Sequence, residues 1–187
     1  MVSLKHTLLI LAVFLMGGCS INNSPARNYV ILTGEHFSRP FFNPSKIDST
    51  VLNARIWISS SCNIYVQDNP EQVNKIIGIS TNPIVKNENS AILGWSTSED
   101  STLDYWMFVN YGNRFEQLHL GVGQPEQWQD LKIWATDSEY HMTFNGVTHT
   151  MSRDGNSNDR FWLVEPYFGG KSPNPSDSEC TIRIEFL

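Results

Sequence analysis

Alternation between apolar and polar residues is the feature that most constrains the fold of this chain. Residues 51–58 alternate around Leu52, Ala54, Ile56 and Ile58, which is the period-two pattern of a strand with one buried face. Similar short segments recur along the chain, at residues 29–32, 64–66, 75–79, 91–95, 105–109, 115–120, 131–135, 140–144, 161–168 and 181–187. No amphipathic run is long enough to compete as a helix. About ten strands at this density predict an all-β domain, a two-sheet antiparallel sandwich or jelly roll.

Two turns support this prediction. Asn145-Gly146 stands between two strand-like segments and is the strongest short hairpin signal in the chain. Residues 110–113, Asn-Tyr-Gly-Asn, form a second favourable hairpin turn. Residues 124–128 suit at most a single helical turn.

The first residues read as a processing segment. A basic start is followed by an apolar run at residues 7–16, which is too short to span a bilayer and suits a secretory signal. The sequence Met16-Gly17-Gly18-Cys19 resembles the lipobox of bacterial lipoproteins, in which the cysteine is lipidated and becomes the new N-terminus. The alternative is an ordinary secreted protein with an incidental third cysteine.

This resemblance divides the chain into three parts. Residues 1–18 are expected to be a signal peptide, residues 19–28 the lipidated Cys19 and a polar tether, and residues 29–187 a single sandwich domain. Because Ser20 follows the cysteine where an Asp commonly retains lipoproteins at the inner membrane, we expect a lipid-anchored protein of the bacterial cell envelope, at the outer membrane.

The charge of the chain narrows the choice of partners. The formal net charge is -6, and removal of the signal with Lys5 makes it -7. Nucleic-acid binding depends mainly on Lys and Arg at phosphates, so we expect no nucleic-acid partner. The same charge disfavours, without excluding, a strongly acidic polysaccharide.

The remaining cysteines are Cys62 and Cys180. In an exported chain they can form one internal disulfide, which would tie an early strand to the last one. Two buried free thiols are the alternative.

Catalytic and metal-binding motifs are absent from the sequence. It contains no Gly-x-Ser-x-Gly elbow, zinc helix, Walker loop or Cys-x-x-Cys pair. His119 and His141 could approach each other only if the sheet pairs them. We therefore expect no metal and no cofactor.

The residue types that sandwich glucanases and polysaccharide lyases use for catalysis identify only weak catalytic candidates in this sequence. The Glu-x-Asp-x-Glu pattern of sandwich glucanases is absent, and the carboxylates are scattered along the chain. Sandwich polysaccharide lyases use Tyr and His or Lys as base and acid near an Arg or Gln. Tyr140, His141 and Glu116 are the candidates that supply such residue types here, and Tyr105 is a further tyrosine of this kind.

Aromatic residues suggest a ligand surface more directly. The chain has six Trp, six Tyr and ten Phe residues, and aromatic faces stack on the apolar faces of sugar rings. The candidate ligand contacts are Trp95, Tyr105, Trp106, Trp162 and Tyr167. For any one of them, a place in the core is the competing interpretation.

Three sequence segments resemble those of a known protein family. They are residues 75–80 (KIIGIS), residues 91–95 (AILGW), and Pro166-Tyr167-Phe168-Gly169-Gly170 followed by Pro173, Pro175 and residues 181–184 (TIRI). Together they resemble a family of bacterial β-sandwich proteins related to concanavalin A-like lectins and glucanases. The resemblance covers roughly residues 70–187 and implies a concanavalin A-like fold. The family has no settled activity, so the resemblance implies less about function.

Three functions remain open from the sequence. The first is a surface lipoprotein with a lectin-like sandwich that binds a neutral glycan. The second is a polysaccharide-degrading enzyme, a lyase or a glycosidase. The third is an envelope module that binds another protein and has no small ligand. The double-glycine corner at Gly169-Gly170 is either part of a ligand wall or a structural corner of the sandwich.

Overall fold

Eleven strands and one short 3-10 helix make up the described part of the chain. The computed structural model describes residues 25–40, 45–47, 50–63, 73–83, 88–98, 100–111, 114–154, 160–169, 173–175 and 177–187. The elements are β1 (Arg27–Ile31), β2 (Val51–Ile58), η1 (Ser60–Cys62), β3 (Asn74–Ser80), β4 (Ser90–Thr97), β5 (Leu103–Tyr111), β6 (Arg114–Gly123), β7 (Gln129–Ala135), β8 (Glu139–Phe144), β9 (Val147–Ser152), β10 (Trp162–Val164) and β11 (Cys180–Phe186). The expected signal peptide, Cys19, most of the tether and the expected strand at 64–66 lie outside the described residues.

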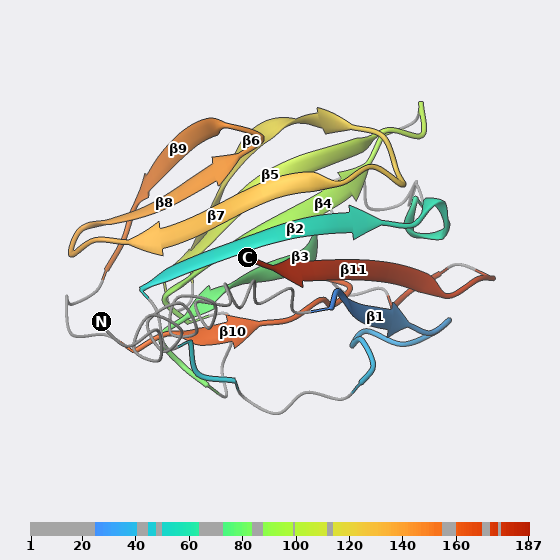
Figure 1. The fold of residues 1–187 in the computed structure, drawn as a ribbon, viewed down its shortest axis with the longest axis horizontal. Coiled ribbons are helices and arrows are strands. Elements are labelled where there is room, and N and C mark those ends of the chain that lie inside the picture. The colour runs from blue at the N-terminus through green and yellow to red at the C-terminus, as the bar shows by residue number, and fades with distance from the viewer. Residues whose placement is uncertain are drawn as a thin grey trace, which may run out of the picture.

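The strands form two antiparallel sheets. One has six strands in the order β1-β11-β2-β7-β8-β9, and the other has five in the order β10-β3-β4-β5-β6. In Figure 1 the six-stranded sheet lies in front, with β2, β7 and β11 side by side, and β3 and β4 lie behind it. The prediction of an all-β, two-sheet antiparallel sandwich is therefore confirmed.

Alternation fixes the inner face of each sheet. In β2, the side chains of Leu52, Ala54, Ile56 and Ile58 are buried between the sheets, while their neighbours in sequence point outward.

The turn at Asn145-Gly146 joins β8 to β9, and both residues adopt positive φ angles of 47° and 84°, as a two-residue hairpin requires. The domain begins slightly before the expected residue 29, because β1 starts at Arg27.

The two strands at the centre of the five-stranded sheet are buried on both faces. Every residue of β3 is buried, and so is every residue of β4 except the last. The apolar runs in these strands are those of a doubly covered strand rather than of a half-exposed one. By contrast, most of β6 is exposed. The outer face of this sheet is thus open to solvent at its β5–β6 side.

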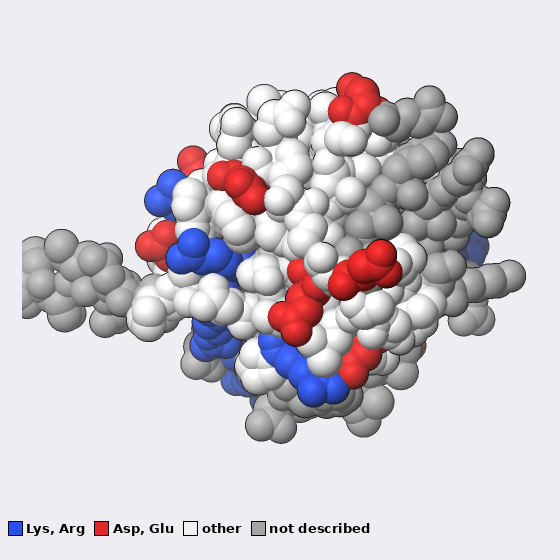
Figure 2. Space-filling view, turned by 90° about the vertical axis from the view of Figure 1, so that its right-hand side faces the viewer, with Lys and Arg blue, Asp and Glu red and all other residues white. Residues whose placement is uncertain are grey.

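Charged side chains are dispersed over the face of the molecule shown in Figure 2. The end of the sandwich shown in Figure 2 carries acidic side chains in several separate groups, with uncharged surface between them. The basic side chains of this view lie mainly toward its left and lower parts. This end of the molecule therefore presents a mixed surface.

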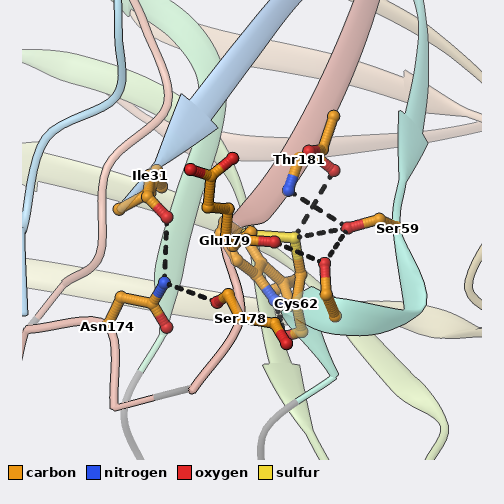
Figure 3. The surroundings of a disulfide bond; sticks show 10 residues. Ile31, Ser59, Cys62, Asn174, Ser178, Glu179 and Thr181 are labelled. Carbon is orange, nitrogen blue, oxygen red and sulfur yellow. Dashed lines mark hydrogen bonds between the residues drawn. A yellow bond between two sulfur atoms is a disulfide. The ribbon is translucent and has the colours of Figure 1, made fainter. Parts of the chain in front are cut away.

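A disulfide closes one corner of the sandwich. Cys62, in η1, is bonded to Cys180, the first residue of β11, as the sequence predicts. Ser59 Oγ accepts a hydrogen bond from the backbone N–H of Thr181 at 3.1 Å, and Ser61 Oγ donates to the carbonyl of Glu179 at 2.6 Å (Figure 3). Covalent and hydrogen bonds together hold the start of β11 against η1.

Loss of this disulfide should destabilise the domain. The bond joins residues 118 positions apart, and a loop of this length corresponds to about 5 kcal/mol of chain entropy in the unfolded state. We expect the Cys62→Ser/Cys180→Ser variant to lose about that much free energy of unfolding in urea. A reducing agent should destabilise the wild type and leave the double variant unchanged. Equal stability of the two proteins would contradict the prediction.

Candidate functional site

The pairing of β5 with β6 decides which side chains of β6 face outward. Trp106 pairs with His119, and residues paired across an antiparallel ladder project from the same face, so His119 lies on the outer face with Trp106. Beyond this pair Tyr105 pairs with Gly121, which leaves Leu120 as the extra residue of a β-bulge. Gly121 has a φ of 144°, which residues with a side chain rarely adopt.

On this face His119 forms a close pair with Asp104. His119 Nε2 lies 2.9 Å from Oδ1 of Asp104, and the two side chains are 43% and 23% exposed. The carboxylate accepts a hydrogen bond, so Nε2 carries the hydrogen, and in the neutral form of the ring Nδ1 presents a lone pair. Among the described residues, Nδ1 has no hydrogen-bond partner. This nitrogen is therefore available to take a proton from a ligand.

Trp106 is the aromatic residue beside this pair. Its ring centroid lies 4.8 Å from that of His119, with the planes inclined at 61°. The indole Nε1 donates to Ser96 Oγ at 2.8 Å, which fixes the orientation of the ring. Trp106 is half-buried, so part of its surface can contact a sugar.

A second aromatic pair continues the outer face along the same two strands. Phe108 and Phe115 stack with ring centroids 4.8 Å apart and planes inclined at 16°. Phe108 is buried, while Phe115 is 60% exposed. Gln117 pairs with Phe108 and lies two residues before His119, so its amide is on the same face as the Asp104–His119 pair.

A buried lysine lies beneath this aromatic pair. Lys75 Nζ is 3.8 Å from the centroid of the Phe108 ring and donates to the carbonyl of Val73 at 2.6 Å. No carboxylate among the described residues forms a salt bridge with it. Burial lowers the pKa of Lys75 to about 8, because the charged form loses hydration. The ring face of Phe108 offers it partial compensation.

The double-glycine corner is structural at Gly169. A Cβ atom there would lie 2.2 Å from the Val73 carbonyl oxygen and 3.2 Å from Lys75 Nζ. The backbone N–H of Gly169 donates to Asn74 Oδ1 at 3.1 Å, and Tyr167 exchanges two backbone hydrogen bonds with Lys75. Gly169 thus lets the chain after β10 approach β3 closely. Gly170 lies outside the described residues.

Two of the predicted ligand contacts are wrong. Trp95 and Tyr105 are 0% and 1% exposed and belong to the core between the sheets. Trp95 donates from Nε1 to the Cys62 carbonyl at 3.4 Å and meets Phe168 edge-on at 5.7 Å. A bound glycan could not reach either side chain. Alternation along β5 makes Tyr105 and Trp106 point to opposite faces of the sheet, and Trp95 is the cross-strand partner of Tyr105. Alternation does not say which of the two faces is covered.

The other three predicted contacts lie on or beside the outer face, but not at one point. Trp106 adjoins His119. Tyr167 lies in the same cross-strand row as Trp106, through Lys75 and Gly94, about three strand spacings or 14 Å away. Trp162 lies on β10 in a different row. The structure therefore associates only Trp106 directly with the Asp104–His119 pair.

The three predicted catalytic candidates do not form a site. Tyr140 is 0% exposed, in the core. His141 lies on the outer face of the opposite sheet, stacked on Trp134 at 4.9 Å. Glu116 is on β6, where it lines a shallow cavity of about 430 Å³ with Tyr111, Arg114 and Asp154. Their grouping as one catalytic set is wrong, because the fold places Tyr140 in the core and the other two residues on different sheets.

Sequence reasoning missed the role of Asp104 and considered His119 only as a partner of His141. These histidines lie on different sheets. The glycine at 121 within an alternating strand was the available sign of a bulge, yet pairing across the hairpin is needed to see its effect. Within the described residues, no group of three or more His, Cys, Asp and Glu residues is placed to hold a metal ion.

Comparison with known proteins supports the fold. No protein-family model and no curated protein matches the chain. Among solved structures, the alginate lyase AlyC3 is 9% identical with a TM-score of 0.54, and the match covers 85% of this chain and 72% of that one. The polysaccharide lyase family 18 protein aly-SJ02 is 11% identical, covers 89% of both chains and has a TM-score of 0.54.

A laminarinase gives a similar result. The catalytic domain of an endo-1,3-beta-glucanase from Thermotoga petrophila RKU-1 is 10% identical with a TM-score of 0.54, and the match covers 87% of this chain and 76% of that one. At these identities the likeness concerns the fold alone. It confirms the concanavalin A-like sandwich.

Titration of Lys75 should be visible in the stability of the protein. The folded protein releases this proton near pH 8 and the unfolded chain near 10.5, so between these values the unfolded state binds more protons and stability rises with pH. Across this pH window, the free energy of unfolding of the wild type should rise by on the order of 2 kcal/mol relative to that of Lys75→Met.

Urea unfolding of both proteins at a series of pH values measures this difference. Buried tyrosines with raised pKa values, Tyr29 and Tyr105, titrate in both proteins, and their effect cancels. If the difference in free energy of unfolding between the two proteins stayed constant from pH 7 to 10.5, the prediction would be contradicted.

Proposed function

We propose that this chain is a polysaccharide-degrading enzyme whose substrate lies on the outer face of β5 and β6. The observation that carries the proposal is the Asp104–His119 pair, joined at 2.9 Å beside Trp106 on an exposed part of the sheet. A lectin needs aromatic and hydrogen-bonding groups, but not a histidine held by a carboxylate with its second nitrogen free. The pair therefore favours degradation over binding of a neutral glycan.

The distribution of carboxylates favours a lyase over a glycosidase. Glycosidases of the common kinds use two carboxyl groups that flank the scissile bond. Among the outward-facing residues of the described five-stranded sheet, Asp104 is the only carboxylate, and it is engaged by His119. Two of the structurally similar proteins are lyases, one of them an alginate lyase solved also in complex with dimannuronate.

The residues of this face can carry out a β-elimination. His119 Nδ1 removes the proton from the carbon next to the carboxylate of a uronate sugar. The electron pair of that C–H bond forms a C=C double bond as the glycosidic C–O bond breaks. The imidazolium, stabilised by Asp104, then returns the proton to the leaving oxygen. The Gln117 amide donates a hydrogen bond to the uronate carboxylate, and Trp106 supports the sugar ring.

The test is turnover of alginate, laminarin and mixed-linkage glucan by the purified domain. Release of unsaturated products from alginate, seen by their ultraviolet absorbance, is the expected result. His119→Ala should lower kcat about 100-fold or more, and Asp104→Asn should lower it by a smaller factor. His141→Ala, a matched histidine on the opposite sheet, should retain wild-type activity.

Three outcomes would contradict this proposal. Saturable binding of glycans without any product would favour a lectin-like protein. Equal losses of activity in His119→Ala and His141→Ala would show that the assigned face is wrong. Absence of both binding and turnover across the panel would favour the protein-binding module.

We further propose that the domain is anchored at the outer membrane through lipidated Cys19. The support is the lipobox-like sequence that ends at Cys19, with Ser20 after it. The first described strand begins at Arg27, so the intervening residues can extend at most about 28 Å. Such a tether would keep the catalytic face close to the membrane surface.

Substitution of the cysteine tests the anchor. Cys19→Ala should abolish incorporation of labelled fatty acid and move the protein from the membrane fraction to the soluble fraction of the cell. Cys62→Ser/Cys180→Ser is the matched control, because it removes the other cysteines and should still be labelled. Labelling that persists in Cys19→Ala would contradict the proposed anchor.

A further inference from the structure

The outer face of the six-stranded sheet carries a ladder of alternating indole and guanidinium groups. The Arg183 guanidinium lies 5.6 Å from the ring centroid of Trp57 and 5.6 Å from that of Trp128. The guanidinium of Arg55 lies 5.3 Å from the Trp128 ring. Arg183 on β11 and Trp57 on β2 are cross-strand partners, and these strands lie side by side in Figure 1. The ladder thus joins two neighbouring strands, β2 and β11, to Trp128, which directly precedes β7.

The two arginines of this ladder differ in their charge partners. Arg55 forms ion pairs with Asp130 at 3.3 Å and with Glu185 at 3.8 Å. Among the described residues, no carboxylate lies within salt-bridge distance of Arg183, and its side chain is exposed. Arg183 is therefore a positive charge whose neutralising partner is not supplied by the described part of the chain.

Stacking prepares Arg183 to bind a carboxylate. A guanidinium group that lies against an aromatic ring keeps its N–H donors at its edges, where they remain free for a planar acceptor. Contact with both Trp57 and Trp128 restricts the rotamers of the side chain, so less entropy is lost when a ligand binds. Carboxylates match this fork with two parallel hydrogen bonds.

We propose that Arg183, held by Trp57 and Trp128, forms a second binding site for a carboxylate-bearing polysaccharide on the face opposite the Asp104–His119 pair. Its ligand class rests on the proposed function, because a uronate polymer is the proposed substrate. The charge and the donor geometry at Arg183 support that class independently. The second site increases the affinity for long polysaccharide chains. One such chain can engage both faces of the domain, or a second chain can bind at Arg183.

The test measures binding of polymeric alginate in a His119→Ala background, in which the polymer is not degraded. Isothermal titration should show that Arg183→Gln lowers the affinity about tenfold, or about 1.4 kcal/mol. Arg183→Lys keeps the charge but loses the planar fork, and it should lower the affinity by a similar factor. Affinity for neutral laminarin should be the same in all these proteins.

The matched control is Lys132→Gln, which removes one positive charge from the same sheet face outside the ladder. It should bind alginate like the parent protein. A loss in Lys132→Gln equal to that in Arg183→Gln would overturn the proposal, because net charge alone would then explain binding. Unchanged alginate affinity in Arg183→Gln, with only a lower Tm, would also overturn it and leave the ladder as a stabilising feature.

Failure of this inference can be told apart from failure of the proposed function. With His119 intact, Arg183→Gln should cleave short oligouronates at the wild-type kcat, since these substrates occupy only the catalytic face. Turnover combined with Arg183-independent binding would overturn the second site alone. Arg183-dependent binding by a protein that never forms product would support the second site and refute the lyase. A parent protein that does not bind alginate would overturn the inference.

Discussion

Burial of β3 and β4 on both faces is the constraint on which the rest of this structure depends. Their inner faces form the core with the six-stranded sheet, and their outer faces are also removed from water. Doubly buried strands must satisfy their backbone through both neighbours, and β3 does so with β4 on one side and with β10 and Tyr167 on the other. The same burial encloses Lys75 and requires glycine at position 169, where a side chain would meet the Val73 carbonyl.

Functional groups gather where that cover ends. β5 shares its covered side with β4, but toward β6 its outer face opens to solvent, and here the register of the β5–β6 hairpin places His119 beside Asp104 and Trp106. The opposite sheet has a different character, because its outer face is regular and two of the tryptophans there, Trp57 and Trp128, lie against arginines. We propose that the first face performs chemistry and the second holds the polymer.

Much of the fold could be predicted from the sequence, whereas little of the candidate site could. Strand positions depend on local alternation, so residues 51–58 coincide with β2, and the Asn145-Gly146 turn joins two strands as expected. The disulfide between Cys62 and Cys180 was expected from the number of cysteines and from the predicted export of the chain. The aromatic candidates were less successful. Trp95 and Tyr105 lie in the core, and Trp106, one residue further along β5, faces outward.

The sequence by itself determined that this chain forms alternating strands, because the period of side chains along a strand is a local property of the backbone. It also determined which residues share a face within a regular strand such as β2. Only the tertiary structure decided which of the two faces is covered, because that depends on contacts between segments far apart in the chain. For the same reason, only the tertiary structure could join Asp104 to His119, since their approach depends on the register of the β5–β6 hairpin.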